Sequence, residues 1–221
     1  MGVAGRSDGP PTAEVRRAEA ALRAAQAPGA GAGDLQALRD ALPVLGRAAR
    51  QDPRGLLLCA EARLVLGAHA GEQRRYAEAV SLSRSAVDLL KRLTPRDPAR
   101  NPPAAVRLAR GYGDLGLWEA RAGRGGVRPV VKAVRIWRRL HTADPGNPDH
   151  LVGLGQSHLL LASRLLDQGN GPKAYAAAQD ASDWYGRVPA EQLPDHARRE
   201  IADVERLLSQ RDRLLGNAPP P

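Results

Sequence analysis

Residues 130–145 read VVKAVRIWRRLHTADP, and the apolar side chains in this stretch recur at helical spacing. Three of them fall on one helical stripe, at spacings of four and three: Ala133, Trp137 and Leu140. The opposite side carries four cations: Arg128, Lys132, Arg135 and Arg139. Pro145 excludes further helix, because proline lacks a backbone donor and disfavours the α conformation of the residue before it. The stretch therefore predicts an amphipathic helix that buries its tryptophan and ends at Asp144-Pro145.

The same pattern of small and apolar residues occurs four times before a proline. The copies are Ala41-Leu45-Ala48, Ala86-Leu90-Leu93, Ala133-Trp137-Leu140 and Ala177-Ala181-Trp184. Each ends five residues later at proline, and the four prolines, Pro53, Pro98, Pro145 and Pro189, are separated by 45, 47 and 44 residues. The first three prolines follow an aspartate. Internal periods of about 20–50 residues are typical of stacked supersecondary units.

A second helical pattern precedes the later copies, at residues 55–68, 104–122 and 148–167. The segments between the paired helices have turn compositions: AGEQRR, GRGG and QGNGP. The chain thus reads as helix-turn-helix units at 12–53, 54–98, 99–145 and 146–189, the first of them less regular. Thr12 or Asp34 is suited to cap a helix start in that first unit.

The end of the chain has a different pattern. One apolar stripe follows Pro194 and the remaining positions are largely charged; the stripe consists of Ala197, Ile201, Val204 and Leu208. One apolar and one polar face is what the terminal helix of a repeat array requires. We therefore expect a capping helix at 191–215, with disordered ends at 1–11 and 216–221.

Composition excludes several classes of protein. Aromatic residues make up 3% and phenylalanine is absent, so the core must consist of Leu, Ala and Val in helices rather than a β-rich fold. The single cysteine, Cys59, excludes an internal disulfide and a cysteine-based zinc site. No apolar run reaches the roughly 18 residues of a membrane span, and no signal peptide is visible. These features predict a cytoplasmic protein that does not enter a membrane.

The net charge of +9 is concentrated in one unit. Residues 99–143 contain ten Arg/Lys against Asp114 and Glu119, a balance of +8. Such a field raises encounter rates with acidic partners. Three interpretations of this charge stay open: a solvated outer face, a surface for an acidic protein partner, and a surface for nucleic acid. GC-rich coding is a further explanation of the many arginines, because only three of the 33 cations are lysines.

Two motifs suggest chemistry that their context does not support. Gly111, Gly113 and Gly116 match G-x-G-x-x-G, but a helical segment precedes them and no acid follows at the required distance. His150 and His158 lie two helical turns apart, and no histidine pair has metal-ligand spacing. The sequence therefore predicts no catalytic residue, metal or cofactor.

The repeated units resemble tetratricopeptide repeats. The resemblance rests on the four patterns in register, on Leu108-Ala109 with Tyr112, on Leu154-Gly155 with His158, and on the segment YAEAV at residues 76–80. It covers roughly residues 12–190. The family's usual period is about 34 residues, so the longer units predict longer helices. Elongated repeats of this kind resemble those attached to bacterial serine/threonine kinases, although no kinase motif is present.

The resemblance implies a superhelix of helix pairs whose first helices line a concave groove. By that analogy Arg110, Asp114, Gln156 and Leu159 face the groove, with Leu160 an alternative to Leu159. The implied function is a non-catalytic scaffold that binds a protein or peptide segment there, with the basic third unit favouring acidic partners. The alternative is a nucleic-acid-binding helical repeat that uses the cations of residues 99–143.

Overall fold

The computed structural model describes residues 13–94 and 96–216, and every regular element in these ranges is helical. The α-helices are α1 (Ala13–Gln26), α2 (Ala32–Gln51), α3 (Pro53–Glu72), α4 (Tyr76–Leu93), α5 (Pro102–Arg121), α6 (Val127–Ala143), α7 (Pro148–Asp167), α8 (Gly171–Tyr185), α9 (Asp195–Leu208) and α10 (Arg211–Leu215). Two short 3₁₀ helices are η1 (Pro98–Arg100) and η2 (Ala190–Gln192). The predicted all-α fold is confirmed. Thr12 and the ends predicted to be disordered lie outside the described residues, apart from Gly216.

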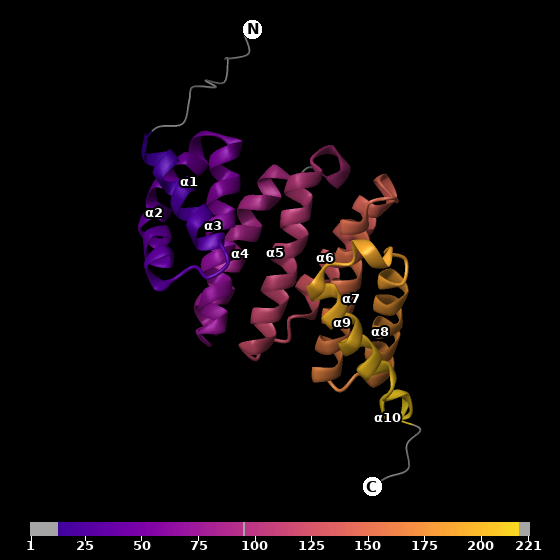
Figure 1. The fold of residues 1–221 in the computed structure, drawn as a ribbon. Helices are drawn as coiled ribbons and strands as arrows, with labels where there is room; N and C mark the ends of the chain where they lie inside the picture. Colours follow the sequence, from indigo (N-terminus) through magenta and orange to yellow (C-terminus); the bar gives the residue numbers. More distant parts are fainter. Residues whose placement is uncertain (1–12, 95, 217–221) are drawn as a thin grey trace.

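The helices stack as a row of antiparallel hairpins (Figure 1). Each helix packs on the next one from α1 to α9, and the odd-numbered helices also touch one another: α1 with α3, α3 with α5, α5 with α7, and α7 with α9. Within the described ranges the even-numbered helices α2, α4, α6 and α8 make no comparable contacts with one another. Helices on the inner side of a curved stack approach most closely, so the odd-numbered helices line the concave side of an α-α superhelix.

The apolar stripes are buried where their spacing predicts. The middle residues of the four patterns are all inaccessible to solvent or nearly so: Leu45, Leu90, Trp137 and Ala181. Trp137 is 3% exposed and shares a core cluster with Leu90 and Leu154, so its indole is part of the core. None of the described helices is both long and apolar enough to cross a bilayer.

Two glycines of α7 allow aromatic side chains to approach the helix backbone. A Cβ atom at Gly153 would lie 2.5 Å from the Trp137 indole, and one at Gly155 would lie 2.7 Å from the Tyr185 ring. Trp137 comes from α6 and Tyr185 from α8, so each partner helix packs directly on α7. A larger residue at either position requires the aromatic ring or one of the helices to move.

The Asp-Pro pairs do not all act in the same way. Asp52 ends α2 and also caps α3, since its carboxylate accepts the Gly55 N–H at 2.7 Å. Asp97 likewise caps η1, four residues after the end of α4 at Leu93. Asp144 ends α6, but α7 begins later and is capped by Asn147. Proline at the first helical position needs no backbone donor, so the residue that stops one helix is well suited to start the next.

The predicted single capping helix at 191–215 is divided into η2, α9 and α10. Its apolar stripe packs as expected, with Ala197 and Val204 buried against residues of α7 and α8. The break after α9 falls at Ser209, whose hydroxyl donates to the Arg206 carbonyl at 2.8 Å and so competes with helix continuation. The short α10 then packs against α8.

Candidate functional site

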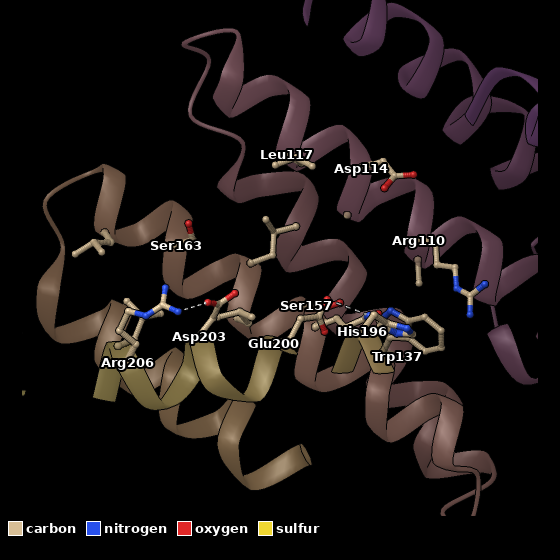
Figure 2. Close-up of a pocket in the computed structure, with 17 residues that line it drawn as sticks. Arg110, Asp114, Leu117, Trp137, Ser157, Ser163, His196, Glu200, Asp203 and Arg206 are labelled. Carbon is tan, nitrogen blue, oxygen red and sulfur yellow. Dashed lines mark hydrogen bonds and ion pairs between the residues drawn. The ribbon is translucent and has the colours of Figure 1, made fainter. Parts of the chain in front are cut away.

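The concave side contains a pocket of about 880 Å³ between α5, α7 and α9. Figure 2 shows side chains of α5 on one side of the pocket and those of α9 on the other, with α7 between them. The α5 residues, Arg110, Asp114 and Leu117, follow one another at helical spacing, and so do those of α7, Gln156, Leu160 and Ser163. Three successive odd-numbered helices therefore contribute one face each.

The structure places all four predicted groove residues in this pocket. Arg110 and Asp114 line it from α5, and Gln156 and Leu159 line it from α7. Leu159 also packs against the apolar core below, whereas Arg110 is exposed. Their juxtaposition follows from the stacking of α5 on α7. Their part in binding a ligand stays a prediction.

Sequence reasoning missed the contribution of α9. Its polar face was interpreted as the solvent-facing side of a capping helix, but five of its residues line the pocket: His196, Glu200, Asp203, Arg206 and Leu207. These positions recur at spacings of three or four along the helix. Since α9 stacks on α7 as another odd-numbered helix, the same spacing that marks groove residues on α5 and α7 marks them here.

Glu200 is held in place by two neighbouring helices. The Tyr185 hydroxyl donates to its Oε2 at 2.5 Å, and the Gln156 amide donates to its Oε1 at 3.3 Å. Burial and the adjacent carboxylate raise the pKa of Tyr185, so the phenol remains a protonated donor. The carboxylate of Glu200 thus has a fixed position on the wall of the pocket. Asp203 next to it pairs with Arg206 at 3.1 Å.

Among the α5 residues that line the pocket, Asp114 has a carboxyl group with a raised pKa. Desolvation raises the pKa of its carboxyl from 3.8 to about 6, and the nearby Arg110 guanidinium partly opposes this. The side chain is partly accessible from the pocket. Near neutral pH the pocket therefore contains a carboxylate that is less well solvated than an exposed one.

Replacing Asp114 with asparagine is expected to stabilise the fold above pH 6. The folded-state pKa is raised, so stability in the wild type falls as the pH rises from about 4 to about 6. Asparagine carries no charge, and we expect Asp114→Asn to gain about 1 kcal/mol at pH 7, less than the full pKa difference implies because water reaches the carboxylate. Urea unfolding at pH 4 to 7 measures this. The two proteins should converge at pH 4, and a less stable variant at pH 7 would contradict the prediction.

The basic patch of α6 is divided between different environments. Arg128 and Lys132 line a second cleft on the outer side of the stack. Arg139 donates a hydrogen bond to the Arg96 carbonyl at 3.1 Å. Arg135 forms no hydrogen bond or ion pair with the other described residues. All four are exposed, on the side of α6 away from the core. None of them lines the concave pocket.

Other charged residues of the third unit have partners in the neighbouring units. Arg107 forms an ion pair with Glu61 of α3, and Glu119 accepts a hydrogen bond from Arg84 of α4 at 2.8 Å. Arg138 lies 3.5 Å from Nε2 of His158. One ion pair neutralises a cation of the third unit and the other neutralises an anion, so these two pairs leave the positive balance of the unit unchanged.

The histidine pair, the G-x-G-x-x-G motif and the single cysteine contain residues that are packed inside the fold. His158 is 2% exposed, with Asp180 at 3.2 Å; burial lowers the pKa of its imidazole, an effect that Asp180 opposes. In the described ranges no group of three or more His, Cys, Asp or Glu side chains is arranged to hold a metal ion. Gly116 of the G-x-G-x-x-G motif packs against Val130 of α6. Cys59 is fully buried, and burial raises the pKa of its thiol.

Comparison with known proteins leaves the site to be interpreted from its own geometry. No protein-family model matches the chain, and a search of curated proteins found no match to it either.

Proposed function

We propose that the chain is a non-catalytic protein-interaction module of tetratricopeptide type, which binds a segment of a partner protein in the pocket between α5, α7 and α9. The observation that carries this proposal is the composition of that pocket, in which leucines and charged side chains from three successive odd-numbered helices face the same open space. Apolar contacts surrounded by polar groups are the usual anatomy of a protein-binding surface.

The leucines of the pocket include side chains that the core does not use. Leu117 of α5 and Leu160 of α7 line the pocket, are partly accessible and belong to no buried core cluster. Leu166 of α7 is 37% exposed, the most exposed large apolar side chain of the described residues. Together they supply apolar surface that a partner side chain can cover.

The charges of the pocket favour a segment with a cationic residue next to an apolar one. Three carboxylates, on Asp114, Glu200 and Asp203, face two guanidiniums, on Arg110 and Arg206. Asp203 and Arg206 already pair with each other, which leaves the carboxylates in excess. The predicted preference for acidic partners therefore does not concern this pocket, because the unpaired cations of α6 lie on the outer side.

Nucleic-acid binding has less support. Single-stranded nucleic acids are gripped by basic grooves with exposed aromatic side chains on which bases stack. Two aromatic residues lie beside the basic patch: Tyr112, which the Lys132 ammonium group faces, and Trp137, which shares α6 with the patch; they are 7% and 3% exposed. Neither ring is available for stacking.

The test compares capture of partner proteins by two matched variants. Leu160→Lys places an ammonium group in the pocket, where it repels a cationic partner residue, without disturbing a core cluster. Val131→Lys makes the same kind of change on α6, at a partly buried residue that lines no described pocket and belongs to no core cluster. We expect partners captured by the wild type from its native cells to bind Leu160→Lys at least about 30-fold more weakly. Val131→Lys should retain them. Equal retention by both variants would rule out this pocket as the binding site.

A further inference from the structure

A second cleft, of about 620 Å³, lies on the outer side of the stack between α4 and the start of α6, with α5 beneath it. It shares no lining residue with the concave pocket. Figure 1 shows the three helices side by side in the middle of the stack. The inference drawn from this cleft is therefore independent of the proposed function of the concave pocket.

The lining of the cleft is strongly cationic. Five cations line it, Arg84, Lys91, Arg124, Arg128 and Lys132, against two carboxylates, Asp88 and Glu119. Both carboxylates already have partners: Asp88 pairs with Lys91 at 2.8 Å, and Glu119 pairs with Arg84 at 2.8 Å. Within the described residues no carboxylate pairs with the other three cations, so a charge of +3 is left uncompensated.

Tyr112 positions two of these cations. Its ring is 7% exposed and lines the cleft, and the Lys91 and Lys132 ammonium groups lie 6.0 and 5.4 Å from the ring centroid. A cation within about 6 Å of an aromatic face is attracted by it. The hydrogen bond to Asp88 raises the pKa of Lys91, which keeps this ammonium charged. The two ammonium groups are therefore held over one buried ring.

The first turn of α6 adds unpaired backbone donors to the same wall. Gly126 precedes the helix with φ +74°, and no side chain caps the helix there. Val127 and Arg128, the first two helical residues, line the cleft, and in the described residues their N–H groups have no recorded acceptor. Such groups, together with the helix dipole, favour an anion. Gly126 packs so closely on α5 that a Cβ there would overlap the Gly116 carbonyl oxygen, which fixes the position of this turn.

A shallower cleft of about 290 Å³ continues the surface along α4. It shares Arg84, Asp88 and Arg124 with the first cleft and adds the hydroxyl-bearing residues Ser81 and Ser85. The cationic site therefore extends along α4 beyond the first turn of α6. A group attached to a longer molecule has room to lie there.

We infer that this outer cleft binds a phosphate monoester. A single carboxylate would neutralise one of three unpaired cations, whereas a phosphate monoester carries about −1.5 to −2 charges at neutral pH and three acceptor oxygens. Guanidinium, ammonium and N-terminal helix donors are the groups that bind such oxygens. The ester belongs either to a phosphorylated protein side chain or to a small phosphorylated metabolite.

The experiment follows the backbone amides of Val127 and Arg128 by nitrogen-edited NMR at constant ionic strength. The probes are phosphoserine, a short peptide containing phosphoserine, glutamate, and a single-stranded oligonucleotide. We expect phosphoserine to shift both amides with saturation. Arg128→Gln and Lys132→Gln should each bind it about tenfold more weakly, because each removes a charged hydrogen-bond donor. Arg135→Gln is the matched control, since it removes the same charge from an exposed position of the same helix outside the cleft.

Each outcome has a defined meaning. Tighter binding of the phosphopeptide than of phosphoserine supports a phosphorylated protein as the source, and equal binding supports a small metabolite. The inference is overturned if phosphoserine leaves the signals of the two amides unchanged, or if glutamate binds as tightly as phosphoserine. It is also overturned if the oligonucleotide binds more tightly than either phosphoserine probe, or if Arg135→Gln weakens binding as much as Arg128→Gln. Thermal unfolding of each variant confirms that the exposed substitutions leave the fold intact.

Discussion

Trp137→Ala is expected to lower the free energy of unfolding by about 3–5 kcal/mol, the largest loss among the substitutions considered. The indole is 3% exposed, packs in the central core cluster and contacts His150 at a ring-centroid distance of 6.1 Å. Its removal leaves a cavity between α6 and α7, where one hairpin joins the next. Urea unfolding followed by circular dichroism measures the loss.

Trp184→Ala serves as the control for this substitution. Trp184 occupies the last position of the fourth pattern, but its ring is only partly buried and contacts Arg187 at 4.4 Å. We expect a smaller loss there, because water already reaches part of the ring. Equal losses at the two tryptophans would show that Trp137 has no special role in joining α6 to α7.

The second large effect is expected at Gly153, which faces the same indole. The Cβ atom introduced by Gly153→Ala would lie 2.5 Å from the Trp137 ring, so the ring or α7 must move. Overpacking of this kind costs about 1–3 kcal/mol, and the better helix propensity of alanine recovers less than about 1 kcal/mol of it. We therefore expect a net loss of about 1–2 kcal/mol, measured by the same urea unfolding.

Two comparisons isolate the cause of that loss. Gly46 lies within α2, and a Cβ atom added there would meet no other atom within 4 Å, so Gly46→Ala should stabilise the fold by about 0.5–1 kcal/mol. In a Trp137→Ala background the clash is absent, and Gly153→Ala should cost nothing further. A loss that persists in this background would assign the effect to something other than the indole.

The fold could be predicted because burial leaves a direct trace in the sequence. Ala133, Trp137 and Leu140 repeat at helical spacing only if one face of the helix is covered, and the recurrence of that pattern at Pro53 and Pro98 requires stacked copies. The spacing of polar residues carries less information. On α9 it does not reveal whether Glu200 meets bulk water or a groove, because that depends on how α9 stacks on α7.

The repeat period does indicate which residues of successive units lie side by side. Gln156 and Glu200, which share a hydrogen bond, are 44 residues apart, and the paired Arg107 and Glu61 are 46 apart. Both separations lie within the 44 to 47 residues that separate the prolines, so equivalent positions of successive units lie side by side. The turn at Asp144 could not be predicted in the same way, because the choice between Asp144 and Asn147 as the cap of α7 depends on local backbone geometry.

The contacts between odd-numbered helices have a mechanical consequence. α5 touches α7 and α7 touches α9, while α2, α4, α6 and α8 lack comparable mutual contacts in the described residues, so the contacts that skip a helix lie along the concave edge. Small rotations of one hairpin about that edge change the spread of the outer helices more than the packing along the edge itself. We therefore expect such rotations to leave the opening between Asp114 and Glu200 comparatively unchanged, because both residues line the pocket along that edge.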